Sequence, residues 1–235
     1  MSTYLQLSNK LREKCGISGT DLTAVTSLTG ESKRVVGWIA EALVDIESRY
    51  TDWRWMRKGF TVNTVASDGI YASGDCTDTD TSVAIASFSH WWAHDELDPF
   101  KCYLSSGGVG GEYRLNYLPW EDFKWLYRMG TQNNSQPIHV SVDHANNLVL
   151  GPVPDAVYVV SGDFQRAAEV LAANGDTPDM PARFHMLVVY EAMKKYATYE
   201  GAGEVFADGN REASRMMRQL EADQRPPMRL SGPLA

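Results

Sequence analysis

The pattern of apolar and polar residues in the first quarter of the chain predicts one long amphipathic helix, from Thr29 to Phe60. Apolar side chains recur there at steps of three and four residues, which places them on one side of an α-helix. The residues of this stripe are Val35, Trp38, Ile39, Ala42, Leu43, Ile46, Tyr50 and Trp53. At a rise of ~1.5 Å per residue the helix would be roughly 40 Å long. A helix of this length needs other helices to cover its apolar side.

Both ends of the chain supply such helices. The expected elements are a helix at Tyr4–Cys15, a second that Asp179 caps and that starts at Pro181, and a third from Glu204 to Asp223. Glycines at 16 and 201 are suitable helix stops. Residues 184–189 are apolar on nearly every side, so we expect the second of these helices to be the buried one.

Between these helical regions the apolar period changes from 3.6 to 2, which is typical of strands. The alternating or aliphatic stretches are Phe60–Thr64, Val83–Ser87, Tyr113–Tyr117, Ile138–Val142, Leu148–Leu150 and Val157–Val160. Turn residues separate them, which favours an antiparallel sandwich or a small barrel. One short helix, 119–130, interrupts the strands.

The chain is therefore predicted to be an α+β protein. Residues 1–59 and 178–224 would form a helical bundle, and residues 60–177 an inserted antiparallel β-sandwich or barrel-like domain. Residues 225–235 would form an extended arm, because Pro226-Pro227 and Gly232-Pro233 are incompatible with a helix.

Composition narrows the class of protein. The chain has 235 residues, is 43% hydrophobic and carries a net charge of −8. No apolar run approaches the ~20 residues of a membrane span. The first residues lack the apolar run of a signal peptide, so we expect a protein made and kept in a cytoplasm unless it travels in an assembly. Cys15, Cys76 and Cys102 are widely spaced, which indicates free thiols.

The negative charge is concentrated between residues 61 and 118, where eight acids face two bases and give −6 of the −8. A protein that grips nucleic acid needs a basic footprint, so this region argues against that function. Unpaired carboxylates are costly to bury, so we expect an acidic face turned to solvent. Its predicted members are Asp75, Asp78, Asp80, Asp95, Glu96 and Asp98.

Three motifs resemble parts of enzymes or metal sites without completing them. His90 and His94 with nearby acids are the best such cluster, and a metal-dependent hydrolase remains an alternative, although the HExxH order is absent. Asp75, Asp78 and Asp80 do not fit the calcium loop of an EF-hand in either register. The glycines of 107–111 precede a strand rather than a helix, which indicates a hairpin loop rather than a phosphate site. We predict no metal, no cofactor and no catalytic residue.

Aromatic residues are abundant, with seven tryptophans and eleven tyrosines. Core packing explains most of them, while subunit contacts or a sugar site would explain the rest. A carbohydrate-binding β module is therefore the first alternative function. The residues that we expect at a subunit interface of the helices are Trp38, Tyr50, Trp53, Trp55, Tyr196, Tyr199 and Met217.

Two segments carry a resemblance to a known family. They are LREKCGISGTDLTAVTSLTGESKRVVGWIAEALVDIESRYTDWRWMRKGF, at 11–60, and MPARFHMLVVYEAMKKYATYEGAGEVFADGNREASRMMRQLEADQRP, at 180–226. In order, spacing and residue type this pair resembles the head-to-tail adaptor (connector, or head-completion) proteins of tailed bacteriophages. The match covers about 100 of the 235 residues, nearly all of the predicted helical part.

The resemblance implies a homo-oligomeric ring, commonly of twelve copies, at the head–tail junction of the virion. The ring would dock under the portal protein, extend the channel for double-stranded DNA without sequence-specific binding, and attach a tail component such as a nozzle, stopper or tail tube. It implies no catalysis, no cofactor and no membrane. Acidic residues on the channel wall would keep DNA from sticking.

The resemblance also gives the C-terminal arm a role, because adaptor termini commonly reach into clefts between portal subunits. The predicted portal-binding residues are Arg225, Pro226, Pro227, Met228, Arg229, Leu230 and Leu234.

Overall fold

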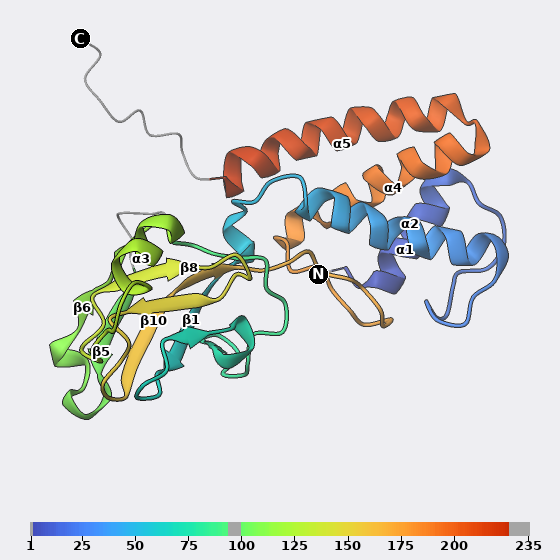
Figure 1. The fold of residues 1–235 in the computed structure, drawn as a ribbon. Helices are drawn as coiled ribbons and strands as arrows, with labels where there is room; N and C mark the ends of the chain where they lie inside the picture. The colour runs from blue at the N-terminus through green and yellow to red at the C-terminus, as the bar shows by residue number, and fades with distance from the viewer. Residues whose placement is uncertain (1, 94–99, 226–235) are drawn as a thin grey trace, which may run out of the picture. The chain divides into compact units, whose positions relative to one another are not determined.

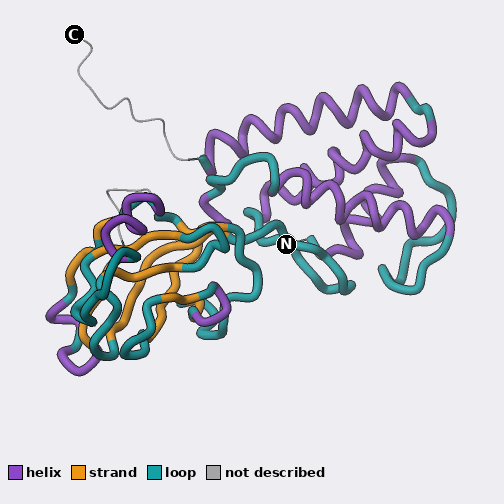
Figure 2. The backbone as a smooth tube through the Cα atoms, in the orientation of Figure 1, coloured by secondary structure: helices purple, strands orange, loops and turns teal. Residues whose placement is uncertain are grey.

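The computed structural model describes residues 2–93 and 100–225. These residues form two compact units, a helical one within 1–56 and 168–235 and a β-rich one at 57–167. Figure 2 shows the long helices of the first unit in purple and the strands of the second in orange. The expected α+β class is confirmed. The inserted unit begins three residues before and ends ten residues before the bounds 60–177 expected from the sequence, since a strand already begins at Arg57 and Leu171 belongs to the helical core.

The helical unit is organised around one buried helix (Figure 1). Its helices are α1 (Tyr4–Cys15), α2 (Gly30–Glu47), α4 (His185–Glu200) and α5 (Gly203–Gln224). Helix α4 packs against each of the other three. Leu187, Val188, Val189 and Ala192 are fully buried. Because neighbouring helices cover α4 on several sides, its apolar residues are not confined to one stripe.

The helix ends follow from local chemistry. Helix α1 begins with a capping box in which Thr3 and Gln6 exchange hydrogen bonds, and it ends at Gly16 with φ 66°. Helix α4 ends at Gly201, whose φ is 71°. The predicted start of α4 at Pro181 is wrong, because residues 182–184 form a 3₁₀ turn (η5, Ala182–Phe184) before the helix begins at His185.

The single helix predicted from Thr29 to Phe60 is also wrong. Helix α2 stops at Glu47 after 18 residues. The chain then turns back, and the indole N–H of Trp53 donates to the carbonyl oxygen of Ile46 at 3.2 Å. Trp53 is fully buried in this position. A short 3₁₀ turn (η1, Arg54–Met56) leads into the first strand, so the apolar stripe continues past the end of the helix that it predicted.

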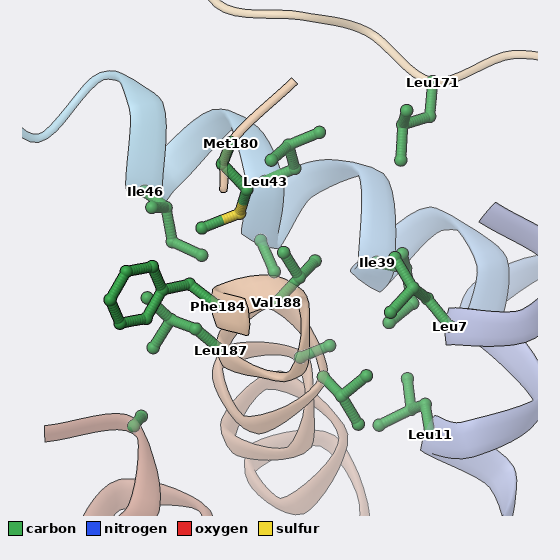
Figure 3. Close-up of a cluster of buried hydrophobic side chains, with 14 of the residues drawn as sticks. Leu7, Leu11, Ile39, Leu43, Ile46, Leu171, Met180, Phe184, Leu187 and Val188 are labelled. Carbon is green, nitrogen blue, oxygen red and sulfur yellow. The ribbon is translucent and has the colours of Figure 1, made fainter. Parts of the chain in front are cut away.

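Figure 3 shows how α1 and α2 meet α4 in the core of the helical unit. Apolar side chains from all three helices meet there. Those with at most 1% exposure include Leu7, Leu11, Ile39, Leu43, Ile46, Leu187 and Val188. Burying each such side chain contributes about 1.5–3 kcal/mol, so this cluster is the main stabilising element of the unit.

The β-rich unit consists of two sheets and one helix. The strands are β1 (Arg57–Asn63), β2 (Ile70–Tyr71), β3 (Thr77–Asp78), β4 (His90–Trp91), β5 (Lys101–Leu104), β6 (Tyr113–Arg114), β7 (Asn116–Tyr117), β8 (His139–Val142), β9 (Leu148–Gly151) and β10 (Tyr158–Gln165). One sheet has the order β3-β1-β10-β5-β6, with β4 also paired to β10, and the other has the order β2-β9-β8-β7. Side chains of both sheets belong to one hydrophobic cluster, as in a sandwich.

Three strand predictions need correction. The stretch from Tyr113 to Tyr117 is not one strand, because the buried Leu115 marks the point where the chain passes from the first sheet to the second. The pairing of β7 with β8 is parallel, whereas we expected only antiparallel pairs. The stretch from Val83 to Ser87 forms only an isolated bridge, between Thr77 and Ala84.

Helix α3 (Trp120–Tyr127) packs on the second sheet as the expected helix of 119–130. Gly151 makes this close approach possible, because a Cβ there would lie 2.6 Å from Cδ2 of Tyr127. The phenol of Tyr127 also shares a hydrogen bond of 2.6 Å with Nδ1 of His139 on β8. Phe123, which is 1% exposed, anchors the inner side of the helix.

Strands β1 and β10 carry the chain into and out of the β-rich unit. They pair residue for residue, from Arg57 opposite Gln165 to Asn63 opposite Val159. Within this pair, Gly162 lies opposite Phe60, and the ring of Phe100 packs directly on Gly162. A side chain at this position would occupy the same space as that ring.

We therefore expect Gly162→Ala to destabilise the protein by about 1–3 kcal/mol or more, because its methyl group forces a buried ring out of place. Urea unfolding followed by tryptophan fluorescence measures this loss. Gly110→Ala is the matched control, since a Cβ at Gly110 meets nothing within 4 Å. Equal stability of the two variants would contradict the packing described for Phe100.

Candidate interaction surfaces

An aromatic patch lies on the outer side of α2 and α4. The ring of Trp38 is 5.8 Å from Tyr196 and 5.6 Å from Tyr199, and the guanidinium of Arg34 lies 4.7 Å above the ring of Tyr199. Tyr199 is 55% exposed. Burial, with further contributions from Cys15, Glu200 and Glu31, raises the pKa of Tyr196. The structure thus brings together three of the residues predicted for a subunit interface.

The other four residues predicted for that interface occupy different positions. Trp53 and Met217 are at most 4% exposed and belong to the core of the helical unit, so they offer no surface to a neighbour. Apolar residues recur at the same spacing whether they face the core or a neighbouring subunit. The sequence alone therefore could not tell a core position from an interface position. Tyr50 and Trp55 are half-buried against Trp53, with ring centroids at 5.2 and 4.5 Å from it.

Arg225, the first residue of the predicted arm, is fixed to the helical unit. Its guanidinium lies 4.2 Å above the ring of Tyr50, and its Nε is 3.4 Å from Oδ1 of Asp52. The Tyr50 hydroxyl donates to Glu221 at 3.0 Å, which links the same ring to α5. The remaining predicted arm residues, Pro226, Pro227, Met228, Arg229, Leu230 and Leu234, lie outside the described residues.

A second group of contacts holds the C-terminal end of α5. Arg54 donates to the backbone oxygen of Asp223 at 3.4 Å, and Arg183 forms an ion pair with the Asp223 carboxylate. Hydrogen bonds, first from Arg183, lower the pKa of Asp223. The point at which the chain leaves α5 is therefore held by cations on two other segments.

Helix α3 presents an apolar surface that the sequence reasoning missed. Trp125 is 73% exposed and Leu126 49%, and Met129, two residues past the last residue of the helix, is 53% exposed. The carboxylates of Glu121 and Asp122 lie about one turn before Trp125 and Leu126, and Glu121 pairs with Lys124 at 2.6 Å. The sequence did contain a signal for this surface, since apolar residues occur on more than one side of this short helix. We call Trp125, Leu126 and Met129 the α3 patch.

A cavity of about 220 Å³ lies beside the inner side of α3. Its lining includes Ile70, Phe123, Tyr127, Leu150 and Val153. The lining also includes Asp68, Arg128 and Gln132, but no histidine or cysteine of the described chain, so it holds no arrangement of nucleophile and general base.

The acidic face is only partly as predicted. Asp75 and Asp80 are exposed, and Asp80 forms an ion pair with Lys58 at 2.9 Å. Asp78 was expected to face solvent, but it is buried at 9% exposure. Its Oδ1 accepts backbone N–H groups of Asp80 and Thr81 at 2.7 and 3.3 Å, which compensates for burial at this turn. Asp95, Glu96 and Asp98 lie outside the described residues.

The enzyme-like motifs gain no support from the geometry. His90 lies on β4, and His94 is outside the described residues. Within the part of the chain that the structure describes, no group of three or more His, Cys, Asp or Glu side chains could hold a metal ion. Burial raises the pKa of the Cys15 and Cys76 thiols to about 12 each, so neither is poised as a nucleophile. Among the helices of the described chain, none is both long and apolar enough to cross a bilayer.

These features define an α+β protein of two units, each with its own hydrophobic core and with exposed aromatic or apolar side chains. The family follows from comparison with known proteins. The chain belongs to the SU10 adaptor protein family, whose model matches residues 2–234. This membership confirms the resemblance to the head-to-tail adaptors of tailed phages. A comparison with curated proteins found no match.

His139 shares a hydrogen bond with Tyr127 and so helps to hold α3 on its sheet. Its titration predicts that the stability of the protein depends on pH. Burial lowers the pKa of His139. A histidine whose pKa is lowered on folding stabilises the protein above its unfolded pKa of about 6.5, and this contribution is lost as the pH falls through the folded pKa. Asparagine at this position could still accept the hydrogen bond but would not titrate. The free energy of unfolding of the wild type, relative to His139→Asn, should therefore fall between about pH 7.5 and about pH 5. A difference that stays constant over this range would contradict the assignment.

Proposed function

We propose that the chain is a subunit of the head-to-tail adaptor ring of a phage particle, docked under the portal protein and bearing the tail. The observation that carries this proposal is the family match over residues 2–234, which includes both the helical and the β-rich unit. The ring, commonly of twelve copies, extends the DNA channel. The chain acts as a structural part and turns over no substrate.

The portal contact is assigned to the C-terminal arm. The contacts of Arg225 with Tyr50 and Asp52 fix the place where the arm starts. Beyond it, Met228, Leu230 and Leu234 supply apolar anchors and Arg229 supplies charge. Two consecutive prolines limit the conformations lost on docking, which lowers the entropic cost of binding.

The tail contact is assigned to the α3 patch. Three large apolar side chains exposed within five residues, on and just after one short helix, are unfavourable in water and typical of a binding surface. Carboxylates at Glu121 and Asp122 border the patch, and Glu121 is 80% exposed. The partner that fits is a tail component with an apolar pocket and basic residues at its rim.

The acidic surface suits a channel through which DNA passes. Asp75 and Asp80 are exposed, and the net charge of the whole chain is −8. Such a surface repels phosphates, so a duplex moves past without being held.

A reconstruction of the virion tests the proposal directly. The protein is expected as a ring on the head–tail axis, between the portal and the first tail component. The mass of the complex formed by purified protein and portal gives the ring stoichiometry. A position anywhere else in the particle would overturn the proposed function.

Deletion of residues 226–235 tests the arm. This truncation keeps Arg225 and its contacts, so the fold and solubility should be unchanged while attachment to the portal is lost. Infected cells should accumulate filled heads that leak DNA and lack tails. A second variant keeps the length of the arm and replaces Met228, Leu230 and Leu234 by serine. It should also lose attachment to the portal if these apolar side chains are what bind. Normal head completion by the truncated protein would contradict the assignment.

Truncation of the most exposed aromatic side chain tests the α3 patch. Trp125→Ala should leave the unfolding temperature unchanged but weaken tail attachment on the order of tenfold or more, as expected for an aromatic anchor. Val65→Ala is the control, since Val65 is another apolar side chain of the same unit that is 60% exposed and lies outside α3. Tail binding equal to that of the control would contradict the assignment. Specific glycan binding by a monomer that depends on Trp125 would instead favour a carbohydrate-binding module.

A further inference from the structure

We infer that neighbouring copies in the ring join through two different faces of the helical unit, the outer face of α5 on one copy and the outer face of α2 on the next. This inference rests on the proposed ring and deepens it by naming the subunit interface. The occupant of each face is therefore a second copy of this chain.

The first face is basic. Arg211, Arg215 and Arg218 recur at steps of four and three along α5, and all three are exposed. The buried residues of the helix, such as Ala213 and Leu220, lie on its other side. We call these three arginines the α5 basic face.

The cations of this face are only partly compensated within the chain. Arg211 pairs with Asp208 and, at 3.4 Å, with Glu212, while Arg215 pairs with the same Glu212 at 2.9 Å. Arg218 has no ion-pair partner among the residues that the structure describes. Three arginines thus share two carboxylates, which leaves one positive charge in excess.

The second face is acidic. Glu41 and Asp45 are one turn apart on α2, and both side chains are 63% exposed. Lys195 of α4 pairs with both carboxylates, at 3.5 and 2.7 Å. Two carboxylates share one ammonium here, which leaves one negative charge in excess. We call Glu41 and Asp45 the α2 acidic face.

An aromatic anchor lies beside the acidic face. Trp38 precedes Glu41 by almost one turn and is half-buried against Tyr196 and Tyr199. Interfaces between proteins commonly have an aromatic residue near the centre and charged pairs around it. Arginines of a neighbour fit this arrangement, since guanidinium groups bind carboxylates in bidentate pairs and stack on aromatic rings.

The two faces lie on different sides of the unit, because α4 packs against α2 and α5 and lies between them (Figure 1). A contact between unlike faces is head-to-tail, and head-to-tail contacts close into a ring when the rotation between copies permits. At every subunit contact of the ring, the excess positive charge of one copy's α5 basic face then pairs with the excess negative charge of the next copy's α2 acidic face.

Charge reversal and its compensation test the interface in assemblies of the full chain with portal. Arg215→Glu with Arg218→Glu, and separately Glu41→Arg with Asp45→Arg, should each reduce ring formation on the order of tenfold or more, because like charges then face each other. The variant with all four changes should restore rings, since it restores opposite charges. Native mass spectrometry measures the fraction of subunits in rings, and circular dichroism reports whether each variant is folded.

The matched control is Lys10→Glu with Lys14→Glu on α1, which alters the net charge as the α5 reversal does but lies on neither face. It should assemble like the wild type. Rings that form normally despite the reversals, or fail to return when all four changes are combined, would overturn the interface and leave the proposed function standing. Loss of rings in the Lys10 and Lys14 control equal to that of the reversals would overturn it as well. A wild type that forms no ring with portal would overturn both the interface and the proposed function.

Discussion

Burial of α4 is the constraint on which the rest of the structure depends. Helix α4 has apolar residues on several sides, so helices from both ends of the chain must cover it. The chain therefore leaves the helical unit after η1 and has to return to it before η5. Strands β1 and β10 meet this requirement, because their pairing brings Arg57 opposite Gln165 at the two ends of the inserted unit.

Features that depend on residues close together in the sequence were predicted better than features that depend on residues far apart. Helix ends set by one residue, such as those at Gly16 and Gly201, were predicted correctly. The end of α2 was not, because it depends on an indole seven residues further along that returns to Ile46. At Leu115 the chain passes from one sheet to the other, and β7 then pairs in parallel with β8. Alternation of apolar and polar residues does not show which sheet a strand joins, so neither feature could be predicted.

The candidate surfaces show the same limit. Periodicity marks an apolar side of a helix without telling whether the chain itself or another chain covers it, so Trp53 and Trp38 were grouped although only Trp38 reaches an outer surface. The α3 patch was missed because the sequence does not tell which apolar residues of α3 pack on the sheet, as Phe123 and Tyr127 do, and which stay exposed, as Trp125 does. Asp78 was placed in solvent because the turn whose N–H groups bind its carboxylate exists only in the folded hairpin.

The charge pattern of the helical unit bears on how a ring would assemble. Two of the three arginines of α5 are paired within the same helix, and Lys195 already pairs with both Glu41 and Asp45 of α2. An interface between these faces would gain only one uncompensated charge pair for each joint, and exposed ion pairs contribute about 0–1 kcal/mol each. Such joints are weak one by one and sensitive to salt. A ring built from them would need a template that presents many sites at once, which raises the effective concentration of each subunit beside the next. The portal, which we propose as the partner of the arm after Arg225, would suit that role, and assembly would then be directed to the vertex where the ring is needed rather than occurring in free solution.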